Sequence, residues 1–102
     1  MTRHALRVDR NQAAIVTALR QAGAHVDVIG LPVDLRIGYV AADGSKRFAY
    51  MEVKDGAKSP SRRKKTKVQE QFFAQYPESQ GWPVCLVDSE ESALRHLRVL
   101  QS

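Results

Sequence analysis

The spacing of the hydrophobic residues changes from a helical to an alternating pattern near residue 25. Before that point apolar side chains recur every three or four positions, as on one face of a helix, at Ile15, Ala18, Leu19 and Ala22. Asp9 or Asn11 can cap this helix by accepting hydrogen bonds from free backbone N–H groups, and Gly23 can end it. The alternation that follows predicts a short strand over residues 25–29.

A β-hairpin is indicated by the next two alternating segments. Residues 33–40 place Val33, Leu35 and Ile37 on one face of a strand and Asp34 and Arg36 on the other. Residues 42–45 contain an Asp-Gly pair, a strong hairpin signal, and residues 47–54 then pair back antiparallel. One face of this third strand carries Ala49, Met51 and Val53. The other face carries Phe48, Tyr50, Glu52 and Lys54.

The C-terminal half reads as helix, strand and helix. A helix over about residues 66–76 is expected to bury Val68, Phe72 and Phe73, and a fourth strand follows Pro83 and runs through residue 87. We expect Trp82 and Cys85 to be core residues. Asp88 or Ser89 caps a last helix with apolar residues at helical spacing, namely Ala93, Leu94, Leu97 and Leu100. The predicted order α-β-β-β-α-β-α describes one α/β domain over residues 1–102, with a single mixed sheet flanked by helices.

Length and composition fit a small intracellular protein. The chain has 102 residues, 43% of them hydrophobic, which allows one modest core that a partner chain would help to complete. Its one cysteine suits a reducing cytoplasm. No segment reaches the roughly 20 apolar residues of a membrane span, and the N-terminus lacks a signal-peptide pattern. We therefore expect a cytoplasmic protein without a membrane partner.

The net charge of +5 is concentrated in one segment. Six of the 16 basic residues and no acidic residue lie within residues 58–67, at Lys58, Arg62, Arg63, Lys64, Lys65 and Lys67. Such a segment can neutralise several phosphates and give salt-dependent, sequence-independent affinity for DNA. The alternative is a solvated charged loop with no ligand.

The predicted hairpin also gathers candidate catalytic residues. Asp34 interrupts an apolar alternation, and antiparallel pairing can place it beside Glu52. Two carboxylates, with the carbonyl oxygen of Val53, are ligands that Mg²⁺ or Mn²⁺ prefers. Lys54 shares the face of Glu52 and could orient an attacking water or stabilise charge on a phosphate. The alternative is a pair of charged residues on the exposed face of a hairpin.

Two other classes of site are not expected. His4, His25 and His96 are scattered along the chain, so no histidine metal site is predicted. The chain also lacks the glycine-rich loop G-x-x-x-x-G-K-[ST] that binds nucleotide phosphates.

In this order of elements, the pattern Val33-Asp34 followed by Glu52-Val53-Lys54 resembles the PD-(D/E)XK nuclease superfamily. More narrowly, Asn11-Gln12, the segment 51–56 (MEVKDG) and Thr66-x-x-Gln69 resemble small phage-borne nucleases similar to the VRR-NUC group and to archaeal-type Holliday junction resolvases. The resemblance covers roughly residues 9–97. Its motifs are short, and their order and spacing carry the likeness.

The resemblance implies a restriction-endonuclease-like core, metal binding by Asp34 and Glu52, catalysis by Lys54 and support from Gln69. The chain departs from the pattern at Val33, which replaces the motif's proline. It also has no glutamate in the first helix, where many members carry one near the position of Ala14. Either Gln12 replaces that glutamate through a water molecule, or the site functions without it.

These expectations describe a Mg²⁺-dependent endodeoxyribonuclease, and the resolvase likeness suggests a structure-specific enzyme whose substrate is branched DNA such as a Holliday junction. Cutting two strands with one site per chain favours a symmetric homodimer. Two alternatives stay open, a non-catalytic nucleic-acid-binding module of the same fold and a nicking nuclease on unbranched DNA. If the gene is phage-encoded, the protein would act in the host cytoplasm.

Overall fold

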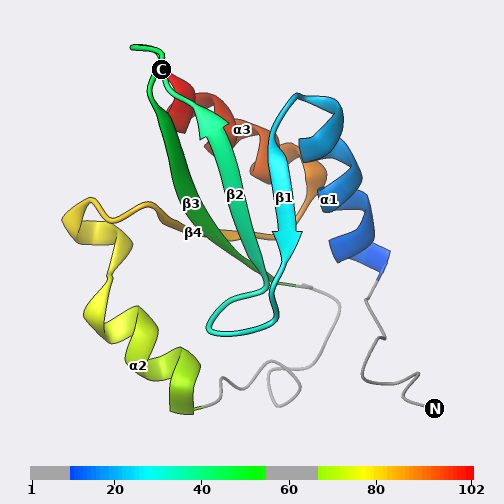
Figure 1. Cartoon of the computed structure of the whole chain (residues 1–102). Coiled ribbons are helices and arrows are strands. Elements are labelled where there is room, and N and C mark those ends of the chain that lie inside the picture. Colours follow the sequence, from blue (N-terminus) through cyan, green and yellow to red (C-terminus); the bar gives the residue numbers. More distant parts are fainter. Residues whose placement is uncertain (1–9, 55–66) are drawn as a thin grey trace.

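A computed structural model of the chain describes residues 10–54 and 67–102 and confirms the predicted order of helices and strands (Figure 1). The elements are α1 (Arg10–Gln21), β1 (His25–Val28), β2 (Leu35–Val40), β3 (Lys46–Val53), α2 (Lys67–Gln75), β4 (Val84–Val87) and α3 (Glu90–Gln101). A short 3-10 helix, η3 (Glu78–Gln80), was not predicted. Within the described ranges, no helix combines the length and the apolar character needed to cross a membrane.

One mixed sheet organises the domain, with the strands in the order β1-β2-β3-β4. The first three strands are antiparallel neighbours, and their register places Val26 opposite Ile37 and Leu35 opposite Met51. β4 joins β3 in parallel, with Met51 opposite Cys85. A parallel pair needs a crossover connection, and α2 lies in the connection between β3 and β4.

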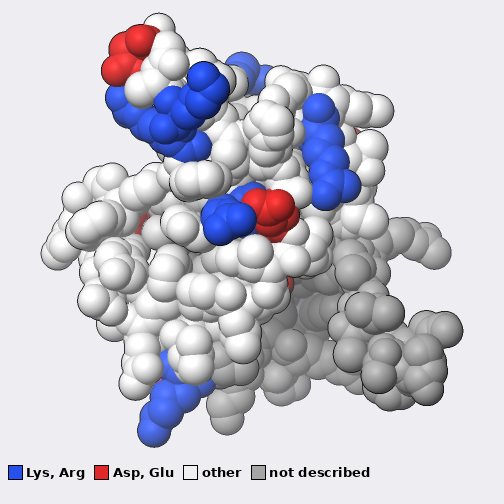
Figure 2. Space-filling view, viewed as in Figure 1, with Lys and Arg blue, Asp and Glu red and all other residues white. Residues whose placement is uncertain are grey.

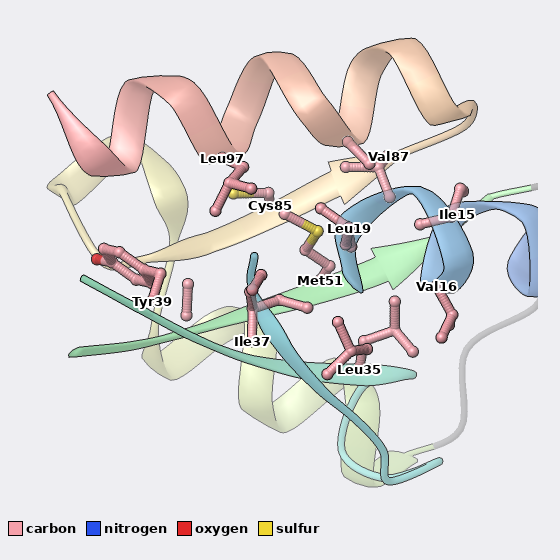
Figure 3. Close-up of a cluster of buried hydrophobic side chains, with 14 of the residues drawn as sticks. Ile15, Val16, Leu19, Leu35, Ile37, Tyr39, Met51, Cys85, Val87 and Leu97 are labelled. Carbon is pink, nitrogen blue, oxygen red and sulfur yellow. The ribbon is translucent and has the colours of Figure 1, made fainter. Parts of the chain in front are cut away.

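The main core lies between one face of the sheet and the helices α1 and α3. Figure 3 shows Ile15 and Leu19 of α1 and Leu97 of α3 pointing toward Ile37 and Met51 of the sheet, and all five side chains are buried. These residues occupy the apolar positions that the periodicity predicted. The opposite faces of β2 and β3 are left for polar and aromatic side chains.

The second helix does not bury the residues expected of it. None of its described residues is buried, and Val68 is 50% exposed. The Phe72 ring instead packs edge-on against Tyr50 of β3 and against Phe73. Phe72 therefore contacts the sheet, whereas Val68 lies one turn earlier and does not join the core.

Trp82 is likewise not a core residue. Its side chain is 47% exposed, and its ring packs against Tyr76 with 5.0 Å between the ring centres. The Tyr76 ring therefore covers part of the apolar surface of Trp82 outside the sheet core. Cys85, by contrast, is buried as predicted.

The structure confirms the predicted cap of α3 and excludes one of the two candidate caps of α1. Ser89 caps α3, because its hydroxyl accepts the backbone N–H of Ser92 and the Ser92 hydroxyl accepts that of Ser89. Asn11 lies inside α1 and does not cap it; its side chain instead donates to carbonyl groups elsewhere in the chain. Asp9, the other candidate cap, lies outside the described residues.

Few charges mark the described surface on the side of the molecule shown in Figure 2, which is mostly uncharged. Among the described residues, Arg36 forms a surface ion pair with Asp27 at 2.8 Å, and Arg47 forms one with Asp43 at 3.0 Å. Both pairs are well exposed, so they contribute little to stability. Five of the six residues in the predicted DNA-binding segment, Lys58, Arg62, Arg63, Lys64 and Lys65, lie outside the described residues, and Lys67 begins α2.

Candidate active site

Asp34 and Glu52 lie side by side, as the hairpin pattern predicted. The sequence predicted Asp34 within the second strand, but β2 begins at Leu35, so Asp34 precedes the strand. Its carbonyl oxygen accepts hydrogen bonds from the backbone N–H groups of Ile29, at 2.9 Å, and Gly30, at 3.3 Å. These bonds hold the entry to β2 in a tight loop, which fixes the position from which the Asp34 side chain projects.

Each acidic side chain accepts a hydrogen bond from a backbone N–H beside or within the other residue. The Asp34 backbone N–H donates to Oε1 of Glu52 at 3.2 Å, and the Val53 N–H donates to Oδ2 of Asp34 at 2.8 Å. Within a strand, the N–H and C=O groups of one residue face the same neighbour. The carbonyl oxygen of Val53 is therefore directed to the same side of β3 as the Asp34 carboxylate, where it can serve as a third oxygen ligand.

Glu52 sits in an environment that opposes its ionisation. Its pKa is raised from 4.5 to about 7, first because burial removes water from the carboxylate and second because the charge of Asp34 lies close. The positive charge of Lys54 acts in the opposite direction. Two neighbouring carboxylates that disfavour a full double negative charge provide a site that a bound cation would stabilise.

Gln69 reaches the same carboxylate from the crossover helix. Its Nε2 donates to Oε2 of Glu52 at 3.4 Å, so each oxygen of Glu52 has a donor, the other being the Asp34 N–H. The contact is long but joins α2 to β3 at the point where sequence analysis placed a supporting glutamine. Gln12 is half-buried in the first turn of α1, and its proposed supporting role stays a prediction.

The backbone of Lys54 is fixed by its neighbours at the end of β3. Its N–H donates to the carbonyl of Val87 at 2.7 Å, and its own carbonyl accepts from Nδ2 of Asn11 at 3.1 Å. The same Asn11 amide also donates to the carbonyl of Asp88 at 3.0 Å. One side chain from α1 therefore ties together the ends of β3 and β4, which holds Lys54 at the edge of the carboxylate pair.

The Lys54 side chain borders a surface cavity of about 440 Å³ that also has Asp88, Ser92, Arg95 and His96 in its wall. Its lining residues include two cationic residues, Lys54 and Arg95, and one acidic residue, Asp88. The hollow is open, and a phosphate group bound there would lie close to the end of β3.

The contact made by Asn11 was missed by the sequence analysis. The residue was considered only as a cap, because its partners lie 43 and 77 positions away in the sequence. The one sequence feature that could have pointed to a role for Asn11 near the site was its place in the Asn11-Gln12 pair, which belongs to the family resemblance. The fold also brings His96 close to Cys85 and Glu78, although the histidines look scattered along the chain.

Comparison with known proteins found no matching family model, no matching curated protein and no matching solved structure.

Proposed function

We propose that this protein is a metal-dependent endonuclease that hydrolyses phosphodiester bonds in DNA. The observation that carries the proposal is the exchange of hydrogen bonds that holds Asp34 and Glu52 together at the start of β2 and the end of β3. Structural ion pairs join opposite charges, whereas this arrangement joins two acids and raises the pKa of one of them. Such pairing is typical of functional sites.

The donor set fits a hard divalent cation. Asp34 and Glu52 offer carboxylate oxygens and Val53 offers a carbonyl oxygen, which are the ligand types that Mg²⁺ and Mn²⁺ bind. When bound, the ion would act as a Lewis acid on the phosphate and lower the pKa of water. The cation would also offset the repulsion that now opposes ionisation of Glu52.

The remaining side chains have separate roles in this proposal. The Lys54 ammonium stabilises negative charge on the phosphate or orients the attacking water. Gln69 holds Oε2 of Glu52 in position. The basic segment, including Lys67 at the start of α2, binds the DNA backbone without reading its sequence. The resemblance to resolvases favours branched DNA and a symmetric homodimer with one site on each strand.

The proposal is tested with end-labelled four-way junction, linear duplex and single-stranded DNA of matched sequence, each with Mg²⁺, Mn²⁺ or EDTA. Asp34→Asn, Glu52→Gln and Lys54→Ala are compared with Asp43→Asn and Lys46→Ala, which alter exposed charges in the β2–β3 hairpin away from the site. We expect metal-dependent cutting by the wild type and by both controls. Each of the three site variants should lose it, while still binding DNA.

The substrate ranking separates the related possibilities. Preferential cutting of the junction identifies a resolvase-like enzyme, and single nicks in linear duplex identify a nicking nuclease. Binding without cutting in any metal, unchanged by Glu52→Gln, would refute the catalytic proposal and leave a DNA-binding module.

A further inference from the structure

A second group of metal-ligand side chains lies on the other face of the sheet. Glu78 of η3, Cys85 of β4 and His96 of α3 each offer one ligand atom, and these atoms lie within 4.8 Å of one another. In the part of the chain that the structure describes, it is the one such group of three. Neighbours along a strand point to opposite faces. Cys85 is paired with Met51, so it lies on the face opposite to Glu52.

The three side chains come together through packing of the C-terminal elements. Figure 3 shows Cys85 pointing from β4 toward α3, beside Leu97. His96 precedes Leu97 on α3, and Glu78 is exposed on the 3-10 helix that leads to β4. All three border an open cavity of about 530 Å³, which Trp82 and Val99 also line. The group is therefore accessible to an ion from solution.

None of the three side chains is engaged in another polar interaction among the residues that the structure describes. No side-chain hydrogen bond or ion pair involves Glu78, Cys85 or His96 within residues 10–54 and 67–102. The ligand atoms thus face one another without bonding to one another. The carboxylate of Glu78 does not stabilise the Cys85 side chain electrostatically, because its negative charge disfavours the thiolate.

We propose that Glu78, Cys85 and His96 bind a zinc ion, with the fourth coordination position open to the cavity. Thiolate, imidazole and carboxylate are all zinc ligands, and the thiolate selects against Mg²⁺, which prefers oxygen. The spacing of the ligand atoms requires only small side-chain movements to reach bonding distance. The ion would join η3, β4 and α3, and so hold the end of the crossover connection against the last helix.

Zinc binding must displace the proton of Cys85. The pKa of this thiol is raised to about 11 by burial first and by the charge of Glu78 second, so the metal-free protein carries the neutral thiol near neutral pH. Binding of the ion releases that proton to the buffer, and affinity should rise with pH. Proton release is therefore a second signature of the site.

The site is tested on the full chain after removal of metal with a chelator. Zn²⁺ is titrated calorimetrically in two buffers of different ionisation enthalpy, and Co²⁺ is used as a spectroscopic probe. We expect about one Zn²⁺ per chain with release of a proton, and a thiolate-to-cobalt charge-transfer band in the near ultraviolet. Cys85→Ala should abolish the band.

His96→Gln and Glu78→Gln alter more accessible ligands and guard against a folding defect in the Cys85 variant. Each should weaken zinc binding by more than about tenfold, because loss of a residue that merely supports a ligand already costs that much. His25→Gln and Ser79→Ala change exposed residues outside the group and should bind zinc like the wild type. Zinc binding with no thiolate band, or unchanged in both ligand variants, would overturn the proposal. Asp34→Asn should keep the zinc site, so failure of the nuclease proposal leaves this test intact.

Discussion

Replacing Glu52 with glutamine should make the protein more stable at high pH and leave it unchanged at low pH. The folded-state pKa of Glu52 is about 7, above its ordinary value of 4.5. Between these values the folded protein binds more protons than the unfolded chain, so stability falls as the pH rises. The stabilisation that comes from keeping Glu52 protonated is fully present below about pH 4.5 and is lost as the pH rises through 7.

The size of the effect follows from the same two pKa values. At about 1.4 kcal/mol for each pH unit between 4.5 and 7, the loss would reach roughly 3.5 kcal/mol if no solvent screened the carboxylate. Glu52 is only partly buried, so screening by water lowers the expected loss to about 1–2 kcal/mol. Glu52→Gln removes the ionisation and should raise the free energy of unfolding by this amount at pH 8.

Urea unfolding of the wild type and Glu52→Gln at pH 5 and pH 8 measures this difference. Glu70→Gln, which neutralises an exposed glutamate on α2, serves as the control and should not gain stability selectively at pH 8. Equal effects of Glu52→Gln at both pH values would refute the argument from burial and from the charge of Asp34. With Mg²⁺ at pH 8, the wild type should recover stability by mass action, whereas Glu52→Gln should recover much less.

Two further variants test the supports of the site. Asn11→Ala should lower the free energy of unfolding by about 1–2 kcal/mol, because the carbonyls of Lys54 and Asp88 lose their shared donor; Thr17→Ala, an exposed change in the same helix, should alter it by less than about 0.5 kcal/mol in matched thermal melts. Ser89→Ala should cost about 1 kcal/mol by removing the cap of α3. A Ser89→Ala melt indistinguishable from the wild type would show that the capping box does not stabilise the helix.

The hairpin and the carboxylate pair were predictable because alternation reports burial directly. Leu35, Ile37, Ala49 and Met51 are all buried, and their register necessarily brings Asp34 toward Glu52. Where the strand begins was less predictable. The hydrogen bonds from Ile29 and Gly30 to the Asp34 carbonyl close a loop before β2. Residues 33 and 34 therefore continue the alternating pattern of apolar and polar residues but do not belong to the strand.

The errors concern residues whose partners are set by tertiary packing. Hydrophobicity alone suggested burial of Val68 and Trp82, but the aromatic rings around α2 pack on one another near the surface. A hydrophobic pattern gives the amount of apolar surface and not the partner that covers it. Asn11 and the group of Glu78, Cys85 and His96 depend on contacts between distant segments, which no local spacing encodes.

The sheet order combines local and nonlocal strand pairing. β1, β2 and β3 pair with their immediate neighbours in the chain, so short loops close them at low entropic cost. β4 pairs with β3 only across the whole crossover, and α3 packs on α1 from the other end of the chain. Asp34 and Glu52 are therefore brought together by the locally connected hairpin and not by the long-range contacts of β4 and α3. Closing these short loops costs less entropy than pairing β4 across the crossover, so the acidic pair depends on the most local part of the sheet.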